Sequence, residues 1–178
     1  MLKNTPQKFG LITRLLHWVS ALTILGVFGL GYWMVDLDYY NQWYQQAPYW
    51  HESIGVLLCL LTLFRLVWRL FTPQPLPLVS HSRIIRAVSK VIQVSLYVLL
   101  FVIFISGYLV PTADGSIINV FGWFNVPSMG LIIEQQEDIA GSVHKYGAYV
   151  FIAFAVFHSI AALKHHFMDK DLTLSRML

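Results

Sequence analysis

The sequence predicts an all-α fold, a transmembrane four-helix bundle, on the basis of composition, segment length and charge placement. Of the 178 residues, 57% are hydrophobic and 12% are charged, whereas soluble domains carry about 25% charged residues. Four apolar stretches are each long enough to cross a hydrocarbon core of about 30 Å as a helix. The charged residues gather at the ends of these stretches and between them. We therefore expect a single transmembrane domain covering residues 1–178.

The four predicted spans follow one another along the chain. They comprise residues 11–35, 51–71, 87–111 and 139–163. The first span is too long for a signal peptide and lacks a small-residue cleavage site, so we expect it to be retained. Pro73, Pro75 and Pro77 end the second helix, because proline removes a backbone donor and restricts the residue before it. The third span has no histidine and is expected only to pack against the other helices.

The basic residues are distributed unequally between the two sides of the predicted bundle. They lie in the N-terminal segment, between the second and third spans, and after the fourth span. The other two connections are acidic, and Lys145 is the basic residue nearest to them. The positive-inside rule therefore predicts that both termini lie in the cytoplasm. The net charge of +3 then reflects membrane topology and does not indicate nucleic-acid binding.

A long connection, residues 112–138, precedes the fourth span on the predicted outer side. Its run 120–127 is apolar and aromatic but too short to span a membrane. We expect this run to form an interfacial or re-entrant cover over the outer end of the bundle. Loops of this length often border a functional site.

Four histidines inside the spans are the main candidates for function. His144 and His158 are fourteen residues apart, close to four helical turns, which places them on one face about 21 Å apart. By depth, His17 matches His158 on the cytoplasmic side, and His51 matches His144 on the outer side. An imidazole at membrane depth is costly unless it is paired or ligated. The two pairs have the geometry needed to hold two haems, each iron bound by two imidazoles between helices.

A small residue follows each of these histidines after one helical turn. The four are Ala21, Gly55, Ala148 and Ala162. A porphyrin lying against a helix needs clearance at this position, whereas a single metal ion does not. Two other interpretations stay open: hydrogen-bonded histidines of a proton relay, and a histidine-based metal transporter. A metal pathway would be expected to add carboxylates, cysteines or methionines, which the span interiors almost lack.

Other polar residues have candidate roles around such haems. Four basic residues at the cytoplasmic helix ends could neutralise haem propionates: Arg14, Arg65, Arg69 and Lys164. Lys145, next to His144, could attract an anionic substrate to the outer side. His81 is expected to be solvated, and His165 and His166 are expected to lie in a polar surface tail.

Several of these residues stand in recognisable motifs. They are Leu16-His17-Trp18, His51 with Gly55, Arg65 and Arg69, and the C-terminal run from Ala161 through Lys164-His165-His166 to Lys170-Asp171 and Thr173-Leu174. Through them nearly the whole chain resembles the bacterial cytochrome b561 family, small four-helix di-haem proteins of the inner membrane. By that resemblance, His17 and His158 would ligate the cytoplasmic-side haem b. His51 and His144 would ligate the periplasmic-side haem b.

The resemblance also implies a function. Family members transfer electrons between a membrane quinone, such as ubiquinone, and a reaction at the periplasmic surface. In the functionally defined members this reaction is oxidation of superoxide, which makes them superoxide:ubiquinone oxidoreductases. The expected partners are therefore a quinone, membrane lipid and a periplasmic electron donor or acceptor. The alternative is a cytochrome b subunit that anchors a larger dehydrogenase or hydrogenase complex in the membrane.

Overall fold

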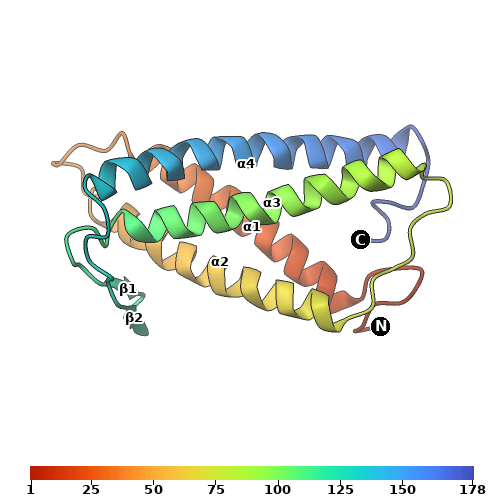
Figure 1. The fold of residues 1–178 in the computed structure, drawn as a ribbon, viewed down its shortest axis with the longest axis horizontal. Helices are drawn as coiled ribbons and strands as arrows, with labels where there is room; N and C mark the ends of the chain where they lie inside the picture. The colour runs from red at the N-terminus through yellow and green to blue at the C-terminus, as the bar shows by residue number, and fades with distance from the viewer.

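The computed structural model describes residues 1–178 and consists of four long helices lying side by side (Figure 1). They are α1 (Leu11–Met34), α2 (Gln46–Phe71), α3 (Arg83–Leu109) and α4 (Gln136–Phe167). Each helix is long and apolar enough to cross a membrane. The predicted fold class, a four-helix transmembrane bundle, is therefore confirmed. The two chain termini lie at the same end of the bundle (Figure 1), which we call the terminal end. The opposite end is the hairpin end.

Helix α1 begins at Leu11 as predicted, whereas α2, α3 and α4 begin earlier than the apolar stretches that predicted them. Helix α2 starts at Gln46, so Pro48 lies in its first turn, where the missing N–H of proline costs no helical hydrogen bond. Helix α3 starts at Arg83 because the Ser82 side chain accepts a hydrogen bond from the Ile85 N–H (3.3 Å). Hydropathy misses such polar first turns, because they lie at the membrane surface.

Helix α4 also ends later than predicted. It continues to Phe167, so His165 and His166 form part of its last turn and do not belong to a separate polar tail. Basic side chains are favourable there because the C-terminal end of a helix carries a partial negative charge.

The bundle is built from two closely packed helix pairs. Helix α1 packs mainly on α2, and α3 packs mainly on α4. Ser20 of α1 and Ser106 of α3 are buried, and each hydroxyl donates to the carbonyl oxygen four residues earlier (2.6 and 2.7 Å). Small residues of this kind allow helices to approach closely in lipid. Most large apolar side chains remain exposed, as expected for surfaces that contact lipid.

A short β-hairpin lies at the end of the bundle opposite the termini and packs on α2. Strands β1 (Ile118–Val120) and β2 (Phe124–Val126) pair antiparallel, and Val120 is completely buried. Ser53 of α2 fixes the hairpin: its hydroxyl donates to the Asn119 carbonyl (3.2 Å) and accepts from the Phe121 N–H (3.3 Å). The run predicted to form a cover folds as a hairpin that packs on α2. Phe121 and Gly122 both adopt positive φ (50° and 72°), which favours a tight β-turn.

The terminal end is closed by contacts between three segments distant in sequence. These are the N-terminal residues 1–10, the loop 72–82 and the tail 168–178. The Leu76 N–H donates to the Pro6 carbonyl (2.9 Å), and the Trp18 indole donates to the Met177 carbonyl (2.8 Å). The Arg176 guanidinium donates to the Leu76 carbonyl (2.7 Å). The tail is thus packed against the helix ends.

The prediction that His81 is solvated is wrong. Its side chain is only 14% exposed, and its Nε2 lies 2.8 Å from Oδ2 of Asp171. Burial alone would raise the pKa of Asp171. Hydrogen bonds from Thr173 and His81, together with nearby His165, instead lower this pKa to about 2. Asp171 is therefore a carboxylate that ties the tail to the loop.

The anchoring role of Ser53 is testable by Ser53→Ala. The substitution leaves the Asn119 carbonyl and the Phe121 N–H without their partner in a buried place. We expect the free energy of unfolding to fall by about 1–3 kcal/mol, measured by chemical or thermal denaturation in detergent. Ser159→Ala is the matched control, because the exposed Ser159 hydroxyl only donates to the carbonyl of Ala155 in its own helix. Equal stability of the two variants would contradict this role.

Candidate functional site

His51 of α2 and His144 of α4 meet near the hairpin end. Their ring centroids are 5.9 Å apart, with an interplanar angle of 74°. Both side chains are partly buried. The structure therefore brings together two histidines, 93 positions apart by their numbers, that depth alone had paired. Because they come from different helix pairs, their contact lies where the two pairs face each other.

The His144 ring is held from one side by α3. Its Nδ1 lies 2.9 Å from the Ile103 carbonyl oxygen, to which an Nδ1–H donates. A donated Nδ1–H leaves Nε2 with a free lone pair, and metal-binding histidines are usually oriented in this way. Gly107 permits the approach, since a Cβ there would lie 2.7 Å from Cε1 of His144. Helix α3 was expected only to pack against the other helices, but it also positions the His144 ring.

The His51 ring packs against a glycine of α1 in the same way. A Cβ at Gly31 would lie 2.7 Å from Cε1 of His51, so only glycine allows this contact. The Nδ1 atom of His51 is buried near the backbone of Val27 in α1, but it makes no aligned hydrogen bond in the chain. Buried polar atoms of this kind need a partner. One turn further along α2, a Cβ at Gly55 would meet nothing within 4 Å, so there is free space beside this ring.

The second predicted pair is arranged differently. His17 contacts its neighbour Trp18 (centroids 5.2 Å apart) and has no direct ring contact with His158. Nδ1 of His17 accepts a hydrogen bond from the Arg65 guanidinium (3.0 Å). The charge of Arg65 also acts on His158. Arg65 therefore connects the two histidines of this pair.

Arg65 is partly buried in the middle of the site and has no acidic partner. Its guanidinium lies 5.7 Å from the centre of the Tyr97 ring, and none of the chain's ion pairs includes it. A partly buried cation without an anion is costly. Such a residue is suited to bind the carboxylate of a ligand through two parallel hydrogen bonds.

The other three predicted propionate partners are engaged within the chain. Arg14 donates to the Leu178 carbonyl, Arg69 donates to the Gln93 side chain (3.2 Å), and Lys164 pairs with Asp169 (2.6 Å). Lys145 is exposed beside His144 and forms no ion pair. It is thus free to meet an anion from outside.

These features fit a haem. Imidazole nitrogens are common axial ligands of haem iron. One place between the helices is surrounded by the two glycines that contact the rings, the free Nε2 of His144 and the His51 ring, whose Nδ1 makes no aligned hydrogen bond. Comparison with known proteins supports the same conclusion, since a family model described as prokaryotic cytochrome b561 matches residues 8–178.

The chain belongs to the prokaryotic cytochrome b561 family. It is 48% identical over 175 residues to cytochrome b561 homolog 2 of Escherichia coli strain K12, and the alignment covers 98% of this chain and 93% of that protein. Membership implies binding of haem b and a role in membrane electron transfer. Together with the four spanning helices, it makes this cytochrome b561 a multi-pass inner-membrane protein.

Sequence reasoning missed three contributors to the site. Gly107 and the Ile103 carbonyl lie on α3, which carries no histidine and therefore gave no sign of a role. Gly31 lies in the apolar first span, and nothing in the sequence identifies the ring that it contacts. A glycine facing a histidine of another helix can be identified only once the helices are placed.

The close contact between Gly107 and the His144 ring is testable by Gly107→Ala. The added Cβ would overlap the imidazole and displace it from the Ile103 carbonyl, and overpacking of this kind costs about 1–3 kcal/mol. We expect the variant to retain less haem than the wild type, measured as haem per chain by pyridine haemochrome. Gly141→Ala on α4 is the control, because its Cβ would meet nothing within 4 Å. Full haem retention in Gly107→Ala would show that haem binding does not require glycine at position 107.

Proposed function

We propose that this cytochrome b561 holds two haems b within the helix bundle, one near each face of the membrane. It passes single electrons between a membrane quinone and a reaction at the periplasmic surface. His51 and His144 ligate the haem at the hairpin end. His17 and His158 ligate the haem at the terminal end. The contact between the His51 and His144 rings, 5.9 Å apart within an apolar bundle, is the observation that carries this proposal.

Each residue around the site has a defined task in this proposal. Bound haem would supply the one-electron chemistry, and two histidines would hold each iron. The Ile103 carbonyl fixes the tautomer of His144 and raises its basicity. Arg65, which donates to His17 in this structure, would be able to hold a haem propionate, and His17 would then be free to act as a ligand.

We place the hairpin end in the periplasm and both termini in the cytoplasm. The support is the concentration of Lys and Arg at the terminal end and the acidic connections at the hairpin end. The His51 and His144 pair then lies nearest the periplasm. This orientation puts exposed Lys145 on the periplasmic side.

A quinone is the proposed partner within the membrane. An apolar groove of about 340 Å³ opens near the hairpin end, between α1, α2 and the connection joining them. It is lined by Leu30, Trp33, Trp43, Ala47 and Trp50. Trp50 directly precedes His51, so a lipid-soluble ring in this groove would lie near the proposed haem. Aromatic walls suit a flat, apolar ligand.

The ligand assignment is testable by removing one histidine at a time. His51→Ala and His144→Ala should each lower the content from two haems to one per chain and remove the same spectral component. His17→Ala and His158→Ala should each remove the other component. The measurements are pyridine haemochrome content and the reduced-minus-oxidised spectrum. Loss of the same component in His17→Ala and His51→Ala would overturn the pairing.

Superoxide is the proposed periplasmic substrate, and Lys145→Glu tests it. Reversing the charge beside His144 should slow haem reduction by superoxide about tenfold at low ionic strength, because electrostatic steering of a small anion is lost. The difference should shrink as salt is added. Lys90→Glu, an equal charge change at an exposed position near the start of α3, should leave the rate unchanged. An unchanged rate in Lys145→Glu would point to another electron donor.

A further inference from the structure

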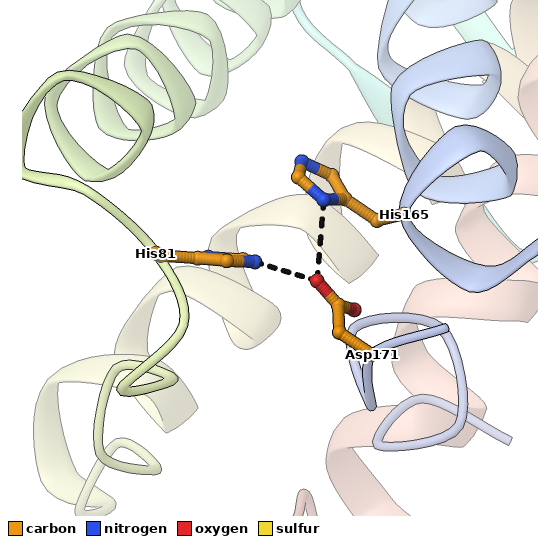
Figure 2. Close-up of side chains that lie close together, drawn as sticks. All are labelled: His81, His165 and Asp171. Carbon is orange, nitrogen blue, oxygen red and sulfur yellow. Dashed lines mark hydrogen bonds and ion pairs between the residues drawn. The ribbon is translucent and has the colours of Figure 1, made fainter. Parts of the chain in front are cut away.

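Three side chains from separate segments converge at the terminal end, away from the proposed haem ligands. His81 comes from the loop between α2 and α3, His165 from the last turn of α4, and Asp171 from the tail (Figure 2). One ligating atom of each lies within 4.8 Å of the others. All three side chains are largely buried, with exposed fractions of 14%, 14% and 9%. The cluster is thus a preformed, water-poor group of metal-binding side chains.

The distances fit a small tetrahedral ion. Oδ2 of Asp171 lies 2.8 Å from Nε2 of His81 and 3.2 Å from Nδ1 of His165. Oδ2 of Asp169 lies 2.8 Å from the same Nδ1. Around a zinc ion with bonds of about 2.0–2.1 Å, neighbouring ligand atoms stand about 3.3 Å apart. A displacement of a few tenths of an ångström therefore opens the cluster for an ion.

Hydrogen bonding within the chain does not account for the position of His165. Its Nδ1 is buried between two carboxylates, yet it makes no aligned hydrogen bond with either of them. Its ring also lies against the His81 ring, with centroids 4.7 Å apart. Two protonated imidazoles at this distance would repel each other, whereas two neutral imidazoles can share a cation.

Neighbouring groups hold the carboxylates in position. The Thr173 N–H donates to Oδ1 of Asp171 (2.7 Å), which leaves Oδ2 directed at both histidines (Figure 2). Lys164 donates to both oxygens of Asp169 (2.8 and 2.6 Å). Partners of this kind orient the ligands in many metal sites.

We propose that His81, His165 and Asp171 form a binding site for a divalent transition metal, with the Lys164-bound carboxylate of Asp169 beside them. Two imidazoles with carboxylates are a ligand set typical of zinc, whereas calcium and magnesium prefer oxygen ligands alone. The bound ion clamps the loop 72–82 and the tail to the end of α4. The site is separate from the haems, because neither histidine belongs to the proposed axial pairs.

The test measures zinc binding to the haem-loaded protein without a histidine tag. The protein is treated with EDTA, dialysed, and titrated with Zn²⁺ alone by calorimetry, and the bound metal is counted by mass spectrometry. We expect one zinc per wild-type chain, in addition to haem iron. Asp171→Asn and His81→Gln should each weaken binding at least tenfold. His166→Gln is the matched control, because it alters the adjacent histidine, which lies outside the cluster.

Thermal unfolding gives an independent readout. Zinc should raise the melting temperature of the wild type and of His166→Gln, but not that of Asp171→Asn, since a ligand stabilises only a chain that binds it. The unchanged haem spectrum of each variant checks its folding, and His81→Gln replaces Asp171→Asn if the latter loses haem. Absence of a wild-type zinc site, or equal affinity in the wild type and both cluster variants, would overturn the proposal. The cluster would then be a metal-free ion pair.

Discussion

The cost of placing imidazoles inside an apolar bundle is the constraint on which this structure depends. A histidine at membrane depth must find a partner, because no water is available there to bind it. His144 finds the Ile103 carbonyl, and His17 finds Arg65. His51 lies near the backbone of Val27 in α1 without an aligned hydrogen bond. Contacts within the chain therefore satisfy the rings unequally, and family membership identifies haem b as the ligand that the bundle binds.

The same requirement explains how the helices are paired. Each histidine near the hairpin end lies against a glycine of the helix that precedes it in the chain, His51 on Gly31 and His144 on Gly107. A side chain at either glycine would separate the pair, so close packing of α1 on α2 and of α3 on α4 depends on them. The two imidazoles then face each other between the pairs. One repeated contact thus sets both the packing and the position of the proposed ligands.

The two ends of the bundle are closed by different chemistry. At the hairpin end, backbone groups of the hairpin bind the hydroxyl of Ser53, and no ion pair is formed there. At the terminal end, loop and tail are held by charged groups, among them the cluster of His81, His165 and Asp171. Arg65 is partly buried between the helices and has no acidic partner. Its charge is therefore available to the proposed haem propionates.

The sequence by itself determined the four spans and the depth of each histidine, because hydropathy and helical periodicity are local properties that survive any packing of the helices. The match of His51 with His144 could be predicted for this reason. Tertiary structure alone decided which glycine receives each ring, that residues 118–126 form a hairpin, and that His81 is buried. His81 and Asp171 are separated by 90 positions, and no local pattern records such a contact, since it depends on how the loop and the tail fold back onto the helix ends.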